Sequence, residues 1–193
     1  MTTYLLVGIM LFMNTVDTKQ NILDIGETLI QQLGYNAFSY MDISRAVGIK
    51  KASIHHHFPK KEDLGAAIIE QHLRKLQIEL QRLEAEKHTA KRKLVKAYRL
   101  ILSITYDDEQ KMCLGGMLAS DMHTLPPIMK VKLKAFFDSL INWISQVVGI
   151  ENNGREIAFQ LASMIEGVLL LGRIYGIQEL TSAIDAFIEN IRI

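Results

Sequence analysis

The chain has 193 residues, of which 49% are hydrophobic and 22% are charged, a balance that excludes an intrinsically disordered protein and allows a sizeable core in one or two domains. Twelve glycines and three prolines exclude collagen-like and proline-rich classes, and a single cysteine excludes a disulfide framework and fits a reducing cytoplasm. The net charge of +1 indicates no overall attraction to polyanions.

The first 13 residues are unusually apolar. Residues 4–13 (YLLVGIMLFM) form a run of ten, whereas a membrane-spanning helix needs roughly 20, and a secretory signal would need a basic start and a cleavage pattern. Three interpretations stay open: a natural start at Met13, an apolar arm packed against the body, or attachment to a membrane. We treat residues 1–13 as an extension or a mis-assigned start, and we expect no stable membrane association.

The rest of the chain has the spacing of successive helices, without the alternation that is typical of strands. Apolar periodicity, caps, glycines and prolines predict helices over residues 17–33, 39–47, 51–57, a long segment beginning at 60–63, 90–106, 112–122, 126–148, 155–175 and 179–191. The acidic residues 107–109 are expected to form a solvated break. The fold class is therefore predicted to be all-α.

Charge is distributed unevenly along these helices. Residues 1–104 contain 15 Lys and Arg against 10 Asp and Glu, whereas residues 105–193 contain 7 against 11. Between residues 39 and 61 five basic side chains accompany a single acid, Asp42. A local excess of this kind attracts phosphates.

Residues 39–58 have the parts of a helix-turn-helix, with two short helices joined by a turn that contains glycine. Ser39 and Asp42 have the spacing of a capping box at the start of the first helix. The second helix begins with basic and hydroxyl side chains and exposes two histidines. In such motifs the N-terminal residues of the second helix enter the major groove, where Lys, Ser and His meet phosphates and base edges.

These residues resemble the DNA-binding domain of TetR-family bacterial transcriptional regulators. The matching segments are 22–24, 34–35, 39–43, 47–54 and 56–64, and a weaker likeness to the ligand-binding half of some members covers 112–117, 125–126 and Trp143. The resemblance implies a three-helix DNA-binding domain at 14–63 and a helical effector-binding and dimerisation domain at 64–193. It also implies that the protein is a homodimeric repressor that binds a palindromic operator in double-stranded DNA. A small apolar or weakly polar effector would release the repressor from that operator.

The resemblance also assigns residues to DNA contact. It implies that Ser39 caps its helix and touches a phosphate, and that Lys61 holds the DNA backbone. The family usually has tyrosine where this chain has His55, a shorter and pH-sensitive side chain. The predicted DNA-contacting residues are Ser39, Lys50, Lys51, Ser53, His55, His56 and Lys61.

The second half offers a candidate pocket and a candidate interface. The helix over 157–174 has an apolar stripe so wide that it must be buried on more than one side. The resemblance implies that the last two helices pair with their copies, through Phe159, Leu161, Ile165, Leu169, Ile184, Phe187 and Ile188. Candidate pocket residues are Tyr98, Ile101, Met112, Cys113, Met117, Phe136, Leu140, Trp143, Met164 and Val168. Alternatively, the helix over 157–174 is the central helix of a monomer, and the candidate pocket residues are ordinary core residues.

Other kinds of function have weaker support. Cys113 begins an apolar helix, whose dipole can lower a thiol pKa, so a repressor that senses electrophiles or oxidants is one alternative. A helical ligand-binding protein without DNA recognition is another. Three consecutive histidines at 55–57 point in different directions on a helix, so no metal site is predicted. No catalytic motif and no cofactor are predicted, and the chain is not expected to be an enzyme.

Overall fold

The computed structural model describes residues 2–105 and 111–193, with side chains described from Thr18 onward except at Ile150. In this part of the chain there are nine α-helices, one 3-10 helix and no strand, which confirms the all-α prediction. The elements are α1 (Thr2–Leu33), α2 (Tyr40–Val47), α3 (Lys51–His57), α4 (Lys61–Ala85), α5 (Ala90–Thr105), α6 (Leu114–Ser120), α7 (Pro127–Val148), η1 (Ile150–Asn152), α8 (Gly154–Tyr175) and α9 (Ile177–Asn190).

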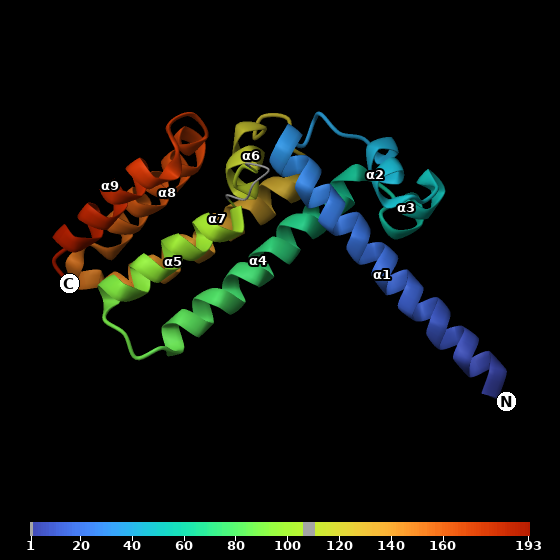
Figure 1. The fold of residues 1–193 in the computed structure, drawn as a ribbon, viewed down its shortest axis with the longest axis horizontal. Helices are drawn as coiled ribbons and strands as arrows, with labels where there is room; N and C mark the ends of the chain where they lie inside the picture. The colour runs from blue at the N-terminus through green and yellow to red at the C-terminus, as the bar shows by residue number, and fades with distance from the viewer. Residues whose placement is uncertain (1, 106–110) are drawn as a thin grey trace.

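Helix bounds follow the sequence closely, with one clear difference at the start. The first helix was expected to begin near Asp17, but α1 begins at Thr2. No proline interrupts residues 2–33, so nothing in the backbone stops the helix earlier. Figure 1 shows the N-terminal part of α1 continuing in a straight line away from the other helices. The break predicted at 107–109 lies outside the described residues.

Helices α1, α2 and α3 form a small unit with its own apolar core. Ile22 of α1, Ile43 of α2 and Ile54 of α3 are completely shielded from solvent. Ser39 caps α2 as the sequence predicted. Gly48 ends α2 at φ 75°, in the left-handed region that favours glycine. Local signals thus fix the turn that sets the direction of α3.

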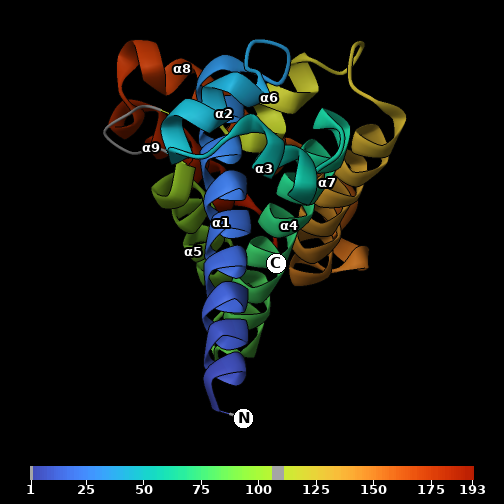
Figure 2. The same cartoon turned by 90° about the vertical axis from the view of Figure 1, so that its right-hand side faces the viewer.

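Helices α4 to α9 form a larger bundle. Helix α7 packs against α4 and α8, and α8 packs against α9. Leu94, Leu118 and Met129 are completely buried in its core. Figure 1 places α8 and α9 at the opposite end of the molecule from α2 and α3, and Figure 2 shows α2 and α3 in front of the bundle.

The short helix α6 connects the two units. The carboxylate of Asp121, directly after α6, accepts hydrogen bonds from the backbone amide of Tyr35 (2.8 Å) and the side-chain amide of Asn36 (3.0 Å). Both donors lie in the loop between α1 and α2. The loop that leads into α2 is therefore tied to the end of α6.

Candidate nucleic-acid interface and ligand cavity

Helix α3 presents most of the predicted DNA-contacting residues on one exposed surface. Lys51, Ser53, His55 and His56 are exposed, and Ile54 between them is fully buried. Lys50 is exposed at the N-cap and makes no side-chain cap of its own. The buried isoleucine holds the helix in place, so the exposed side chains remain available to an outside partner. They can supply cations and hydrogen-bond donors to a phosphate backbone.

The Ser39 hydroxyl is already engaged within the chain. Its Oγ accepts a hydrogen bond from the amide of Met41 (3.2 Å) and donates one to Oδ2 of Asp42 (2.7 Å). The backbone amide of Ser39 also donates to Asp42 Oδ2 (2.8 Å). These bonds from Ser39 lower the pKa of Asp42. The reciprocal pair fixes the first turn of α2.

His55 is held in position by its neighbours. Its ring packs edge-on against Tyr40 with centroids 4.9 Å apart, and Nδ1 donates to the backbone oxygen of Pro59 (3.1 Å). Tyr40 is anchored in turn, because its hydroxyl donates to the backbone oxygen of Phe58 (2.8 Å). A carbonyl oxygen only accepts, so Nδ1 carries the proton and the neutral ring keeps Nε2 as an acceptor. Only Nε2 of His55 is therefore left to face an outside partner.

Lys61, which was predicted to hold the DNA backbone, is bonded within the chain. Its ammonium donates to the backbone oxygens of Tyr35 (2.6 Å) and Phe38, and it lies over both of their rings, 4.6 and 4.1 Å from the centroids. Burial lowers the pKa of Lys61. The lysine thus holds the loop between α1 and α2, because that loop offers two carbonyl oxygens without helical partners.

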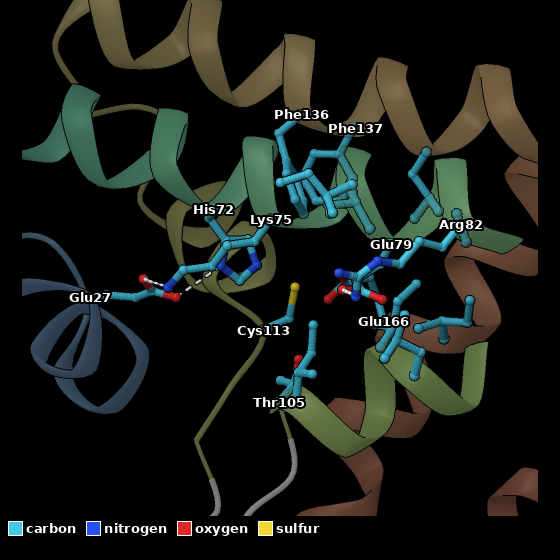
Figure 3. Close-up of a pocket in the computed structure, with 18 residues that line it drawn as sticks. Glu27, His72, Lys75, Glu79, Arg82, Thr105, Cys113, Phe136, Phe137 and Glu166 are labelled. Atoms are coloured by element: carbon cyan, nitrogen blue, oxygen red, sulfur yellow. Dashed lines mark hydrogen bonds and ion pairs between the residues drawn. The ribbon is translucent and has the colours of Figure 1, made fainter. Parts of the chain in front are cut away.

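A cavity of about 670 Å³ lies within the larger bundle and reaches α1 of the smaller unit. Its lining comes from α1, α4, α5, α7, α8 and the segment before α6, and comprises Glu27, His72, Lys75, Leu76, Ile78, Glu79, Arg82, Leu100, Ile101, Ile104, Thr105, Cys113, Phe136, Phe137, Leu140, Ala162, Ile165 and Glu166. This volume is within the range of sites for small organic molecules. Figure 3 shows the labelled side chains around it.

Only part of the predicted pocket lines this cavity. The predicted residues that do so are Ile101, Cys113, Phe136 and Leu140, whereas Tyr98, Met112, Met117, Trp143, Met164 and Val168 do not. Helix packing directs the side chains of Tyr98 and Trp143 away from the cavity. The Tyr98 hydroxyl donates a hydrogen bond to Asp185 of α9. Trp143 lines two smaller hollows, one between α4 and α7 and the other between α4, α5 and α7. Size and hydrophobicity alone did not reveal which way each side chain faces.

The polar lining on α4 was missed by the sequence reasoning. His72, Lys75, Glu79 and Arg82 recur at intervals of three and four residues, which places them on one face of the helix. That spacing was a readable signal. It was overlooked because a charged stripe on a long helix usually faces solvent.

One end of the cavity is an ionic cluster that joins α1 to α4. Glu27 of α1 contacts Nδ1 of His72 (2.8 Å) and Nζ of Lys75 (3.5 Å). Burial acts to raise the pKa of Glu27, but the hydrogen bond and charge from His72, together with Lys75, hold that pKa below its ordinary value. A side chain of the smaller unit therefore forms part of the cavity wall.

The thiol of Cys113 differs from the low-pKa thiol that its helix position suggested. Burial raises its pKa well above the ordinary value, and the charge of Glu166 raises it further. The side chain is only 3% exposed. The lowered thiol pKa on which the sensor alternative depended is therefore not found, because burial and the carboxylate outweigh the helix N-terminus, and this alternative is not favoured.

Two adjacent glycines in α6 allow close packing against the cavity wall. A Cβ on Gly115 would lie 2.7 Å from the ring of Phe136 and 2.8 Å from that of Phe137. A Cβ on Gly116 would lie 2.6 Å from Oε2 of Glu166. Only glycine leaves room there, so the backbone of α6 accommodates both the aromatic rings and the carboxylate.

The predicted dimer residues are mostly buried within the protomer. Leu161, Ile165, Leu169, Ile184 and Ile188 are at most 2% exposed, so they cannot present a surface to a partner, and Phe187 is half-buried. Phe159 is exposed, together with Leu170, Leu171, Ile174 and Tyr175 of the same helix. Of the α8 residues predicted for the interface, only Phe159 lies on the uncovered face, because α7 and α9 pack against the rest of the helix.

Helix α8 carries several exposed apolar side chains along its uncovered side. Phe159, Leu170 and Ile174 are 51%, 55% and 72% exposed, and Gly167 between them has open space where a Cβ would project. Among the described helices, α8 alone is long and apolar enough to suit a membrane by composition, although that test is also passed by core helices of soluble proteins. Its contacts with α7 and α9 place it as a bundle helix with one uncovered side.

Comparison with known sequences points to one family. The sequence model described as "Bacterial regulatory proteins, tetR family" matches residues 22–68. The chain is 41% identical over 46 residues to IcaR of Staphylococcus epidermidis, a negative transcriptional regulator of a biofilm operon. It is 32% identical over 56 residues to the transcriptional repressor NemR of Escherichia coli. These matches cover 24% and 29% of this chain, and about a quarter of the length of those curated relatives.

Solved structures extend the likeness to the whole chain. A TetR transcriptional regulator from Legionella pneumophila is 42% identical, with a TM-score of 0.85 over 90% of this chain and 97% of that one. A TetR-family regulator from Agrobacterium tumefaciens is 30% identical, with a TM-score of 0.84 over 93% of this chain and 100% of that one. Both the smaller and the larger unit are therefore shared with these proteins.

Proposed function

The chain belongs to the TetR family of bacterial regulatory proteins, and from that premise we propose that it is a cytoplasmic, homodimeric repressor of transcription whose DNA binding responds to a small molecule. In this proposal residues 14–63 read the DNA. Residues 64–193 bind the effector and the second protomer.

The exposed surface of α3 carries the DNA-binding part of the proposal. Lys50, Lys51, Ser53 and His56 are exposed together around the buried Ile54. Their charges and donors suit phosphates and base edges in a major groove. Lys61 contributes indirectly, by holding the loop that precedes α2.

The exposed face of α8 supports the homodimer. Phe159, Leu170 and Ile174 form an uncovered apolar stripe, and Gly167 allows a partner helix to approach closely. Two copies related by a twofold axis would bury the stripe against itself and present two α3 helices. A palindromic operator matches that symmetry.

The cavity supports control by a ligand. Glu27 of α1 and Cys113 before α6 both line it, and α6 is tied through Asp121 to the loop before α2. A ligand that fits one arrangement of these helices better than another shifts the population of dimers that match the operator. The ligand in this proposal is small and mainly apolar, as most of the lining is.

Selection of DNA fragments tests the proposal. Purified protein is mixed with sheared DNA from its own genome, and the retained fragments are sequenced. We expect a small set of fragments that share an inverted repeat. The Lys51→Ala variant should retain them less well, whereas Lys87→Ala, which removes an exposed lysine far from α3, should behave as the wild type. Retention of random fragments only would contradict DNA recognition.

A further inference from the structure

The charged side chains around the cavity do not balance. The described lining contains three carboxylates, those of Glu27, Glu79 and Glu166, but only two permanent cations, Lys75 and Arg82. Figure 3 shows Glu27 with Lys75 on one side of Cys113, and Glu79, Arg82 and Glu166 on the other. With His72 neutral, the formal excess is one negative charge.

Both cations are already paired with other carboxylates. Lys75 contacts Glu27 (3.5 Å), and Arg82 contacts Glu79 (2.6 Å). The side chains of Lys75 and Arg82 are 57% and 69% exposed, so they lie at the rim. Among the described residues no Lys, Arg or His forms an ion pair with Glu166, whose polar neighbour is the Cys113 thiol. Glu166 is therefore the one carboxylate of the described lining that has no cationic partner.

The surroundings of Glu166 form a shaped site. Gly116 leaves room for its Oε2, since a Cβ there would lie only 2.6 Å away. The rings of Phe136 and Phe137, 5.2 Å apart, line the same cavity. A carboxylate in a cavity with aromatic and aliphatic walls provides what an organic cation needs, namely a counter-charge, ring faces and apolar contact for its body.

We propose that the effector is an apolar organic cation whose charged nitrogen becomes the missing partner of Glu166. This inference rests on the proposed function, because it assigns a ligand class to the cavity of a ligand-responsive regulator. An anionic ligand would add a like charge beside Glu166. A neutral apolar ligand would remove water from the carboxylate without replacing its hydrogen bonds, which is unfavourable.

Cation binding is coupled to the protonation of Glu166. Burial raises the pKa of its carboxyl group, so the protonated form becomes populated as the pH falls, and a bound cation expels that proton. The affinity for a cation of fixed charge should therefore rise with pH across the titration of Glu166. The other titratable groups facing the cavity are Cys113 before α6, Glu27 on α1, and His72, Lys75, Glu79 and Arg82 on α4, while α5 and α7 contribute none.

Calorimetry with three probes of matched shape tests the inference. The probes are phenylbutyltrimethylammonium, its neutral analogue with carbon in place of nitrogen, and phenylpentanoate, each titrated into the full-length protein. We expect the cation to bind at least about tenfold more tightly than either of the others, as a desolvated cation beside aromatic rings does. Its affinity should rise with pH, and that of the neutral probe should not.

Variants separate the role of Glu166 from general hydrophobic binding. Glu166→Gln keeps the shape and should lower the cation affinity about tenfold or more without changing that of the neutral probe. Glu156→Gln, on the exposed surface of the same helix, should leave both affinities unchanged. The added methyl group of Gly116→Ala would intrude on Oε2 of Glu166, so this variant should also bind the cation more weakly. Equal affinities for the cation and the neutral probe, or undiminished cation binding by Glu166→Gln, would overturn the inference.

Operator binding is measured separately on a fragment selected as above. Release of that fragment by the cation, with no release from Glu166→Gln, is the result that we expect. A cation that binds through Glu166 but leaves operator affinity unchanged would overturn its role as effector. Failure to retain any specific fragment would contradict the proposed function, and the calorimetric result would still decide the ligand class.

Discussion

Lys51 and Lys61 carry the same charge in opposite surroundings. Lys51 is exposed at the start of α3, whereas the ammonium of Lys61 is bonded to the oxygens of Tyr35 and Phe38. The resemblance to the family assigned both lysines to DNA contact, but only the folded loop between α1 and α2 reveals the second role. Sequence can identify a lysine beside a helix start, but not which carbonyl oxygens the chain brings to it.

Truncation of the two lysines should therefore change different properties, DNA binding for Lys51 and stability for Lys61. Lys51→Ala should reduce the slope of log affinity against log salt by about one, without lowering the melting temperature, because one phosphate contact is lost. Lys61→Ala should reduce stability by about 2 kcal/mol, because two carbonyl oxygens lose a charged donor. Fluorescence anisotropy over a salt series and thermal denaturation measure the two effects. Equal loss of salt slope in both variants, with equal stability, would contradict this division.

At the scale of helices, features that depend on nearby residues could be predicted from the sequence, and features that depend on contacts between distant segments could not. Helices α2 and α3 were placed correctly because Ser39, Asp42, Gly48 and Pro59 mark their ends locally. The cavity was only partly predicted, because its lining combines six separate segments of the chain. The register of helices against one another decides which side chains face it, and periodicity within a single helix does not contain that information.

Helix α6 shows how such a long-range contact can be tested. Directly after its last turn, the carboxylate of Asp121 accepts a hydrogen bond from the backbone amide of Tyr35 (2.8 Å), which lies 86 residues earlier in the sequence. Asp121→Ala should speed hydrogen exchange at the Tyr35 amide, because that amide loses its acceptor. The Gly48 amide, bonded to Ser44 O (3.0 Å), should be unaffected. Exchange rates resolved by NMR measure both sites, and an unchanged rate at Tyr35 would show that the tie is absent.

At the scale of the whole molecule, the small net charge is the sum of a basic first half and an acidic second half. The basic excess lies in residues 1–104, which include the exposed surface of α3, and the acidic excess lies in residues 105–193, which include α8 and Glu166. Figure 1 shows α3 and α8 at opposite ends of the molecule. The proposed DNA-reading end and the proposed pairing end thus lie far apart, with the cavity in the bundle between them.

The pairing end makes a direct prediction about oligomeric state. Ile174→Asp should convert a dimer into a monomer and sharply weaken operator binding, because it places a charge in the apolar stripe of α8. Val131→Asp changes an equally exposed apolar residue on α7, 68% against 72%, and should remain dimeric. Light scattering after size-exclusion chromatography measures the mass. A dimer that survives Ile174→Asp would place the interface elsewhere.

The central claim is that this protein recognises a particular DNA sequence, and a ratio of affinities tests it most directly. The wild-type protein is titrated against a genomic fragment that it selects and against a fragment of the same length and composition with the sequence scrambled, at one physiological salt concentration. We expect the selected fragment to bind at least about a thousandfold more tightly, as specific sites do. Equal affinities for the two fragments would contradict the claim.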